Sequence, residues 1–594
     1  MNSVFADPAA WPICIVAGLL TLAGVLLAGA KIVPTLLSDI VTLAATAIAG
    51  GMAAVLAMRI GDHPALYWMG GWTPRQGQAI GIAFLADRAG AGATAFAGLM
   101  FTVAIWFARG HFAGARNHFH VLMLLFLASQ CGFFFAHDLF DMFVWFEMMS
   151  VAGFALTGYA LRSPSLDGAL NFTILNTIGA YLILMGIALA YARANALDFS
   201  AVRAIAQGQP DDPLLIAAFV LITTGFLTKA AQVPFHFWLP DAHAVAPSPV
   251  SAIFSGIMVS VGLFGVARMV WEVFAPCPVV RHLVHVGLMS LGCGSAVMGA
   301  VMALMQRHVK RMLAFSTVSH VGVALIGVGL LGQQGLGGSL LYLAGHGLIK
   351  AVLFMIAGIM LSTLGGIDEI GLRGAGRPIW PAGIVMGACA LVLAGIPIGP
   401  LDAGAQMMDA QARSSGLHGL TLVIGFAGAL TGGAVLRVTG RVFFNLGPTS
   451  GEEDAAPTDD EREHANRPFA AQLVPVLALL AVWVLFGIVF ASGAEDFALA
   501  AARDMTLDAD FFPRRGLPHV TPVLPWLPAL IAMAIASADL NRHHIPDAVY
   551  GAFAGASRPA FRMLQAIHDG VIGEYVLWMM AGLVFLAGIA ILGC

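Results

Sequence analysis

Several ionisable side chains stand inside long apolar stretches of this sequence, where a charge is expensive. Glu147 is flanked by Trp145, Phe146 and Met148, and Lys229 follows fifteen uncharged residues. A charge at the centre of a membrane helix costs roughly 2.5–3.5 kcal/mol on insertion scales, so each such residue suggests a function. The chemistry available to a carboxylate and a lysine in such a place is proton transfer.

Lys229 lies five residues before a proline in the stretch TKAAQVPFHFWLPDAH. Pro234 has no N–H, so the carbonyl of Ala230, four residues earlier, loses its helical partner. Irregular backbone at membrane depth is tolerated only where protein covers it or where it lines a hydrated cavity. We therefore expect a helix that is broken beside Lys229, whose desolvated side chain can exchange a proton. The plainer alternative is a kinked helix with a snorkelling lysine.

Two histidines and a second lysine form another group of candidates. His346 and Lys350 are four residues apart and share one face of the expected helix. His320 lies about ten residues into its own apolar stretch. Imidazole titrates near neutral pH and can pass a proton between its two nitrogens. A lone histidine in a span is more often a packing residue, and it is the neighbouring lysine that favours a relay here.

A second tier of relay candidates lies closer to the ends of the apolar stretches. Asp138 and Asp141 fall near the mouth of the helix that carries Glu147, where an interfacial carboxylate is the alternative interpretation. His236 and His243 follow the expected break, and the alternative for His243 is a place at the aqueous rim.

The composition predicts an all-α polytopic membrane protein with about 14–16 transmembrane helices. Of the 594 residues, 59% are hydrophobic and 10% are charged, and the mean hydropathy is +0.86. Apolar runs of roughly 20 residues, enough to cross the hydrocarbon core, recur along the chain. The sixteen expected spans lie near residues 12–31, 33–57, 92–108, 118–137, 139–161, 168–192, 214–246 (broken), 249–272, 283–304, 312–331, 338–363, 380–410 (broken), 417–444, 470–491, 523–539 and 574–593.

Other kinds of site find no support in the sequence. The six cysteines form no CxxC pair and stand near no histidine at ligand spacing, so we expect no metal centre and no cofactor. Dinucleotide, nucleotide and metalloprotease motifs and a nucleophile elbow are missing, and no feature suggests nucleic-acid binding. The first apolar segment follows Asp7 without a basic region, so we expect a retained helix rather than a signal peptide.

The distribution of positive charge gives an orientation. Lys and Arg are more numerous in the loops that are cytoplasmic when the N-terminus is outside, and we assign only Lys229 and Lys350 to spans. We therefore expect both termini to be periplasmic in a bacterial inner membrane.

Two segments interrupt or extend the membrane core. Residues 447–468 are acidic and rich in Pro and Gly, which indicates a hydrophilic linker. The remainder, 469–594, is expected to be a C-terminal transmembrane extension that contains an amphipathic helix along the membrane surface. Residues 1–117 are expected to form additional N-terminal helices.

The sequence resembles the proton-conducting, antiporter-like membrane subunits of respiratory complex I, Mrp-type sodium/proton antiporters and energy-converting hydrogenases. The resemblance covers roughly residues 120–445 and is closest to the Mrp D subunit. It is carried, in the family's order, by the segments DLFDMFVWFEMMSVAGFAL, TKAAQVPFHFWLPDAHAVAPSPVSAIFSGIMVSVGLFGVAR, ALMQRHVKRMLAFSTVSHVGVALIG, LLYLAGHGLIKAVLFMIAG and LRVTGRVFF.

This resemblance implies two inverted five-helix repeats, at 118–272 and 283–444, each with a broken helix. It implies that Glu147 and Lys229 are the paired acid and lysine of the first repeat. It also implies that His320, His346 and Lys350 form the central and exit parts of a relay.

Two departures from the family pattern affect this relay. Ser260 stands where the family often has a lysine, and the second break, GIPIGPLDAGAQMMDA, lacks the usual ionisable residue. Asp402 and Asp409 are the candidates to replace it.

The resemblance favours a proton-translocating subunit of a multisubunit Mrp-like cation/proton antiporter. Its partners would be other membrane subunits in the lipid bilayer, and its ions protons and, in an antiporter, Na⁺. One alternative is a pumping subunit of a complex I-like or hydrogenase-like enzyme, without redox centres of its own. Another, of a different class, is a scaffold that has lost conduction.

Overall fold

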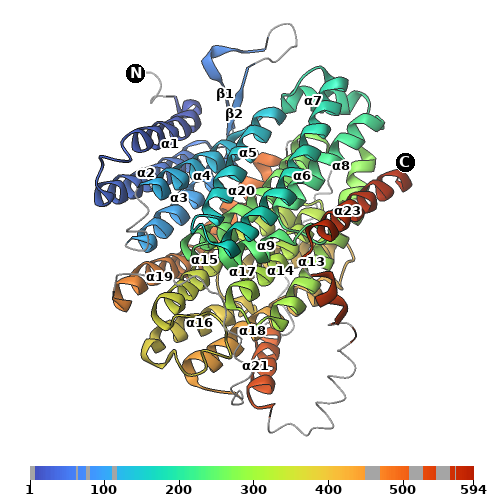
Figure 1. Cartoon of the computed structure of the whole chain (residues 1–594). Coiled ribbons are helices and arrows are strands. Elements are labelled where there is room, and N and C mark those ends of the chain that lie inside the picture. The colour runs from blue at the N-terminus through green and yellow to red at the C-terminus, as the bar shows by residue number, and fades with distance from the viewer. Residues whose placement is uncertain are drawn as a thin grey trace.

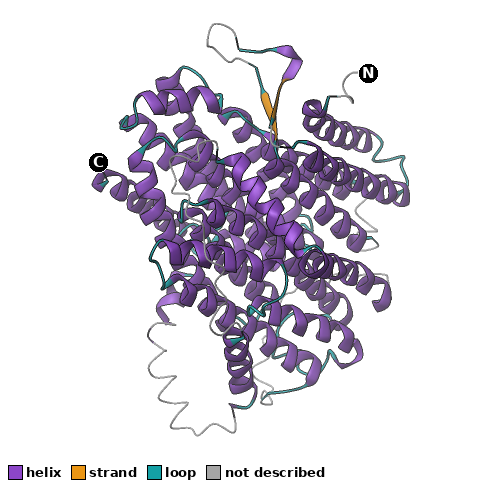
Figure 2. Ribbon diagram, turned by 180° about the vertical axis from the view of Figure 1, so that it is seen from behind, coloured by secondary structure: helices purple, strands orange, loops and turns teal. Residues whose placement is uncertain are grey.

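The protein is an all-α polytopic membrane protein. The computed structural model describes residues 7–61, 64–74, 81–109, 117–447, 468–506, 526–542, 559, 562–568 and 570–593. Over these ranges, 13 helices are long and apolar enough to cross a membrane, and three shorter apolar helices accompany them. Together they account for each of the sixteen expected spans. Figure 1 shows the helices packed as one body, and Figure 2 shows a pair of short strands projecting from it.

The helices that form the spans have the following bounds. They are α1 (Trp11–Ala28), α2 (Thr35–Arg59), α3 (Arg88–Ala108), α4 (His118–Phe135), α5 (Leu139–Thr157), α6 (Ser163–Ala194), α8 (Pro213–Lys229) with α9 (Trp238–Val245), the continuous helix Ser248–Val273 that contains α11 (Val259–Arg268), the helix Pro278–Met305 that contains α13 (Met289–Met305), α14 (Val309–Gly329), α15 (Gln333–Leu364), α16 (Trp380–Leu393) with α17 (Pro400–Ser414), α18 (Leu420–Phe444), α19 (Phe469–Val484), α21 (Leu527–Leu540) and α23 (Ile572–Leu592).

Both expected helix breaks are present. The first separates α8 from α9 at residues 230–237, and the second separates α16 from α17 at residues 394–399. Gly395 and Gly399 both adopt positive φ in the second break, a conformation that glycine reaches without steric penalty.

The sequence analysis did not predict several short elements that lie outside the apolar spans. Two amphipathic helices, α7 (Phe199–Gly208) and α20 (Ala491–Met505), lie in stretches expected to be loops. The strands β1 (Ala65–Trp68) and β2 (Ala83–Ala86) pair antiparallel on the same face as α7 in Figure 1. None of these elements is long and apolar enough to be detected as a span.

The expectation that only two Lys or Arg residues lie within spans was wrong. Arg268 is fully buried near the end of the helix Ser248–Val273, and Lys310 is 1% exposed in the first turn of α14. Arg437 and Arg441 lie within α18, where both bind Glu369. The charge count behind the orientation therefore included groups that are not in loops.

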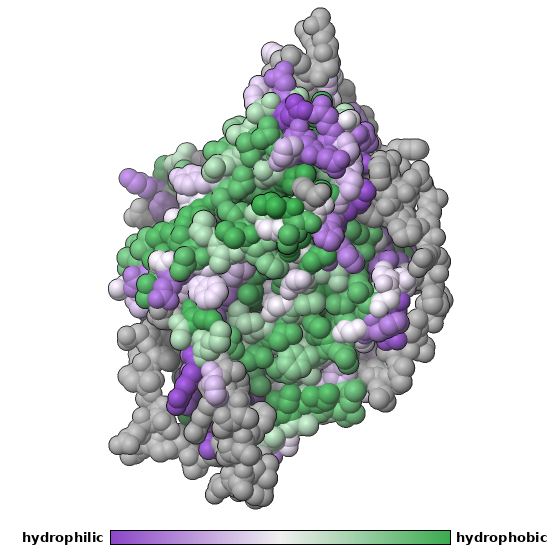
Figure 3. Space-filling view, turned by 90° about the vertical axis from the view of Figure 1, so that its right-hand side faces the viewer, coloured by the Kyte–Doolittle hydropathy of each residue, from purple (hydrophilic) through white to green (hydrophobic). Residues whose placement is uncertain are grey.

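The C-terminal part packs back onto the core. Helix α21 lies along α18, and α23 lies against α8, as the red helix beside α8 in Figure 1 shows. The expected linker 447–468 falls almost entirely outside the described residues, and so does most of the expected surface helix. Figure 3 shows a face that is mainly hydrophobic, with hydrophilic residues gathered toward the upper end.

The helix that carries His346 and Lys350 approaches the helix Ser248–Val273 very closely. A Cβ atom added at Gly347 would lie 2.2 Å from the carbonyl oxygen of Gly256. Small residues allow such close contact between membrane helices. This contact fixes the depth at which α15 presents its ionisable side chains.

Gly347→Ala should therefore destabilise the protein by about 1–3 kcal/mol, because neither backbone can move without disturbing its neighbours. Thermal unfolding in detergent measures the effect. Gly51→Ala is the matched control, since no atom lies within 4 Å of the added Cβ there. Equal melting temperatures for the two variants would contradict the close packing.

Candidate proton-transfer site

Lys229 is the last residue of α8 and is fully buried beside the first break. Its Nζ donates to Ser150 Oγ on α5 at 2.7 Å. The same nitrogen lies 4.7 Å from the ring centroid of Phe146 and 5.4 Å from that of Phe172. One hydroxyl and two aromatic faces therefore replace the water that a lysine normally has, which is a thin shell for a buried ammonium.

The carbonyl freed by the break has found a partner. Gln232 Nε2 donates to the oxygen of Ala230 at 2.9 Å, and Val233 N donates to Ser295 Oγ at 2.9 Å. The expectation that Ala230 loses its helical partner is correct, and a side-chain amide takes that partner's place. Trp238 Nε1 caps the Thr228 carbonyl at 2.8 Å on the other side of the gap.

Glu147 lies half-buried on α5, one turn before the serine that holds Lys229. Its Oε1 is buried without a hydrogen-bond partner among the described residues. No ion pair within 4.0 Å joins its carboxylate to Lys229 in the described part of the chain, although the two charges interact electrostatically. Glu147 and Lys229 are thus neighbours without an ion pair among the described residues, and Ser150 connects the helix of Glu147 to Lys229.

His320 is held by two hydroxyl groups in the middle of α14. Its Nδ1 lies 2.6 Å from Tyr342 Oη and its Nε2 lies 3.0 Å from Thr431 Oγ1. The Thr431 hydroxyl donates its proton to the carbonyl of Ala427 at 2.7 Å, so it can only accept from the imidazole. The ring is therefore assigned the Nε2–H tautomer, and Tyr342 donates to Nδ1.

His320, His346 and Lys350 lie close together. The rings of His320 and His346 stack with centroids 5.2 Å apart, and Lys350 acts electrostatically on both rings. Neither ring nitrogen of His346 has a hydrogen-bond partner among the described residues. Lys350 Nζ donates to the carbonyl of Leu313 at 2.7 Å. His320, His346 and Lys350 are therefore brought together, whereas no hydrogen bond between described residues joins them to Lys229.

His243 is not at an aqueous rim. It is fully buried, and its ring stacks on that of Phe354 with centroids 4.5 Å apart. Neither of its ring nitrogens has a hydrogen-bond partner in the part of the chain that the structure describes. Lys350 and the buried Lys310 both act on it electrostatically. His243 therefore belongs to the buried polar groups around α14 and α15.

His236 connects the first break to the C-terminal extension. Its Nε2 lies 2.8 Å from Nε2 of His568, whose Nδ1 lies 2.8 Å from the carbonyl of Leu564. His236 is almost completely buried. This contact was not foreseen, because His568 stands 332 residues away.

The acidic candidates on α5 lie near its start. Asp138 caps the helix by accepting from the backbone N–H groups of Phe140 and Asp141, and burial raises the pKa of Asp138. Asp141 is buried in the first turn. Ser260 is on α11, and its hydroxyl has no hydrogen-bond partner among the described residues. It lines a cavity of about 800 Å³ whose walls come mainly from α2, α3, α11, α15 and α20.

The aspartates of the second break are bound to local partners. Asp402, in the first turn of α17, accepts from Gln406 at 2.5 Å. Asp409 pairs with Arg413 at 2.8 Å and accepts from Thr421. Neither reaches His320, His346 or Lys350 by a hydrogen bond among the described residues.

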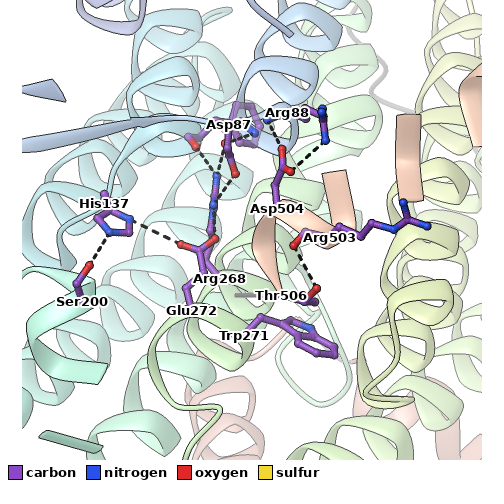
Figure 4. A network of polar contacts seen from close by, with 12 residues as sticks. Asp87, Arg88, His137, Ser200, Arg268, Trp271, Glu272, Arg503, Asp504 and Thr506 are labelled. Atoms are coloured by element: carbon purple, nitrogen blue, oxygen red, sulfur yellow. Dashed lines mark hydrogen bonds and ion pairs between the residues drawn. The ribbon is translucent and has the colours of Figure 1, made fainter. Parts of the chain in front are cut away.

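A second buried ionic cluster was missed entirely. Arg268 lies between Asp87 and Glu272 and pairs with both. Figure 4 shows that Glu272 in turn contacts His137, which contacts Ser200. The spacing of Arg268 and Glu272, four residues apart in an apolar helix, was the signal available in the sequence. Within the described ranges, no three His, Cys, Asp or Glu side chains come together as a metal site requires.

The comparisons with known proteins agree with the motifs. Residues 136–404 match the family described as NADH:quinone oxidoreductase/Mrp antiporter, transmembrane. This part of the chain, somewhat less than half of its length, resembles that family. The expected resemblance to antiporter-like membrane subunits is therefore confirmed, and the matched range contains all five principal relay candidates.

Two curated relatives match parts of the chain. NADH-quinone oxidoreductase subunit N of Desulforudis audaxviator (strain MP104C) is 30% identical over 331 residues, which are 55% of this chain and 65% of the relative. Hydrogenase-4 component B of Escherichia coli (strain K12) is 32% identical over 288 residues, which are 46% of this chain and 42% of the relative. The chain thus spans about two thirds and two fifths of these relatives.

Solved structures share the fold over a larger part of the chain. A chain of the Mrp complex from Dietzia sp. DQ12-45-1b superposes with a TM-score of 0.73 at 23% identity, covering 84% of this chain and 97% of that one. A chain of the membrane-bound sulfane sulfur reductase, an archaeal respiratory membrane complex, gives 0.72 at 22% identity with the same coverage. Both neighbours come from membrane complexes.

Tyr342→Phe tests the arrangement around His320. Losing the phenol leaves a buried imidazole nitrogen without its donor, which should cost about 1–3 kcal/mol of stability. Thermal unfolding in detergent measures the loss, and Tyr181→Phe is the control, because Tyr181 is 62% exposed. A Tyr342→Phe protein as stable as the control would mean that the tyrosine does not hold the ring.

Proposed function

We propose that the protein is a proton-translocating subunit of a multisubunit Mrp-like cation/proton antiporter. The observation that carries the proposal is the fully buried Lys229 at a helix break, beside Glu147 but not paired with it. Ionisable groups in a membrane interior that are not locked in an ion pair are suited to exchanging protons. The resemblance of residues 136–404 to the antiporter-type family supports the same function.

The mechanism begins with the separation of Glu147 and Lys229. A carboxylate nearby favours a protonated lysine, and its withdrawal favours proton release. Ser150 lies on the helix of Glu147 and binds Lys229, so a movement of α5 alters both interactions at once. The released proton passes through transient water toward His320, His346 and Lys350.

Transfer through the second group relies on imidazole chemistry. The stacked rings of His320 and His346 lie next to Lys350. Neither nitrogen of His346 is hydrogen-bonded within the described residues, so both can take part in proton exchange. Ser260 lines the cavity together with Leu343 and Leu348 of α15, the helix of His346 and Lys350, and can order water beside that helix. Asp138, Asp141, His236, His243, Asp402 and Asp409 are secondary members.

We assign the domains as the sequence predicted. Residues 118–272 form the first inverted repeat and conduct protons, and residues 283–444 form the second. The presence of one interrupted helix in each stretch supports this division. Residues 1–117 are the N-terminal helices, 447–468 a hydrophilic linker and 469–594 the C-terminal extension.

The protein would reside in a bacterial inner membrane with both termini outside, among other membrane subunits, and would exchange protons for a monovalent cation, with Na⁺ as one candidate. A second candidate function is a proton-pumping subunit of a redox complex. The names of the two curated relatives, an NADH-quinone oxidoreductase subunit and a hydrogenase component, favour it. In that case the electron-transfer centres would belong to other chains.

Glu147→Gln should slow proton transport by roughly a hundredfold or more, because a positioned acid–base group contributes about 10²–10⁴-fold. Lys229→Gln should do the same. Proton uptake by vesicles that contain the complete complex measures both. Asp167→Asn on α6 is the control, since its carboxylate is exposed and far from the break in sequence.

Equal rates of proton uptake for wild type and Glu147→Gln would contradict the proposed relay and would favour a scaffold without conduction. Replacing Na⁺ by another cation in the same vesicles separates the two remaining functions. An antiporter depends on the opposing cation gradient, whereas a redox-driven pump depends on electron donor and acceptor.

A further inference from the structure

The ionic cluster at the α7 end of the molecule contains one more carboxylate than its central guanidinium can neutralise. Arg268 binds Asp87 through two contacts of 2.9 and 2.8 Å and also binds Glu272. Asp87 has a further duty, since it caps α3 by accepting from Gly90 N at 2.9 Å. Arg203 directs Nη1 to the backbone carbonyls of Trp271 and Glu272.

Glu272 is therefore the carboxylate with spare capacity. It is 2% exposed, and its Oε2 has no hydrogen-bond partner among the described residues. That oxygen faces Nδ1 of His137 at 3.8 Å, and this nitrogen likewise has no hydrogen-bond partner within the described ranges. A buried polar atom without a partner is costly, and here two of them point toward each other.

His137 connects this pair with the surface. It lies between α4 and α5 and is 5% exposed, and its Nε2 is 3.3 Å from the hydroxyl of Ser200, an exposed residue of α7. Burial, with Arg268 adding to it, lowers the pKa of His137 to about 3. The ring is thus neutral at ordinary pH and carries one proton, on either nitrogen.

The two tautomers of His137 require different protonation states of Glu272. With Nδ1–H, the ring donates toward the carboxylate. With Nε2–H, Nδ1 presents a lone pair to Glu272, which is favourable only when Glu272 carries the proton. The other charged groups around the pair are Arg268, Asp87 and Arg203, with Asp138 and Asp198 next to His137.

The inner side of the cluster borders the cavity that Ser260 lines. Ser260, Phe264 and Arg268 follow one another at four-residue spacing on α11. The cavity of about 800 Å³ reaches from Ser260 past Phe264 and Ala267 to Ala89 and Phe134. Ala89 is two residues from Asp87, and the carbonyl of Phe134 accepts from Arg268, so the cavity ends at the base of the cluster.

From this geometry we infer that Glu272 and His137 form a proton-exchange port on the α7 face, which serves the relay from its outer end. This inference rests on the proposed proton translocation. In the exchange, the proton of Glu272 Oε2 moves to His137 Nδ1, and the proton on Nε2 leaves to Ser200 and surface water. Glu272 becomes a carboxylate that accepts from Nδ1–H and stays paired with Arg268. The reverse sequence takes a proton in.

Infrared difference spectroscopy between acidic and alkaline pH tests proton binding directly, on the purified full-length chain. We expect a pH-dependent C=O stretch from a protonated carboxyl that is lost in Glu272→Gln. It should be retained in Asp504→Asn, which removes a carboxylate that binds Arg88 on the same face. It should shift in His137→Gln, which folds around an unchanged Glu272. Identical spectra for wild type and Glu272→Gln would overturn the port.

Transport separates this inference from the proposed function. In vesicles, His137→Gln should slow proton release at the α7 face by roughly a hundredfold. Glu147→Gln should slow transport as predicted above but keep the Glu272 band, so the port can be measured even where the relay fails. A His137→Gln complex that transports as fast as wild type would show that protons do not pass this way.

Discussion

The energetic cost of a charge without water governs this structure. Backbone groups solve the problem by forming helices, whereas side chains must find partners at the same depth. Arg268 finds two carboxylates, and Arg437 and Arg441 share Glu369. Among the described residues, Lys229 contacts a serine hydroxyl and two aromatic faces, with no carboxylate within ion-pair distance. The buried charges therefore differ in kind: the arginines are held in ion pairs that join helices, whereas Lys229 is not.

The elements most dependent on the membrane were the easiest to predict. An apolar run of roughly 20 residues has few other uses, so all sixteen expected spans appear as helices. Pro234 allowed the first break to be predicted, because a missing N–H removes a hydrogen bond within its own helix. The amphipathic helices α7 and α20 were missed, since helices of 10 and 15 residues at the ends of spans carry no long apolar signal.

The same distinction between local and long-range features applies to the candidate site. His346 and Lys350 were paired correctly because four-residue spacing on one helix is visible in a sequence. The partners that fix His320 were not visible, because Thr431 stands 111 residues away. Asp87 and Arg268 are separated by 181 residues and meet only through the packing of α3 against the later helices. Single-sequence reasoning thus finds the ionisable groups but not which ones neutralise each other.

The two helix breaks have acquired different chemistry. At the first, a lysine ends α8 and the freed carbonyl is taken by Gln232, so the ammonium does not have to satisfy the backbone. At the second, Asp402 already accepts from Gln406, and Asp409 is paired with Arg413. Both aspartates are thus engaged by side chains of their own region, and neither contacts His320, His346 or Lys350 by a hydrogen bond among the described residues. In the proposed relay, transfer through the second half would therefore use the histidines and Lys350, with the two aspartates in secondary roles.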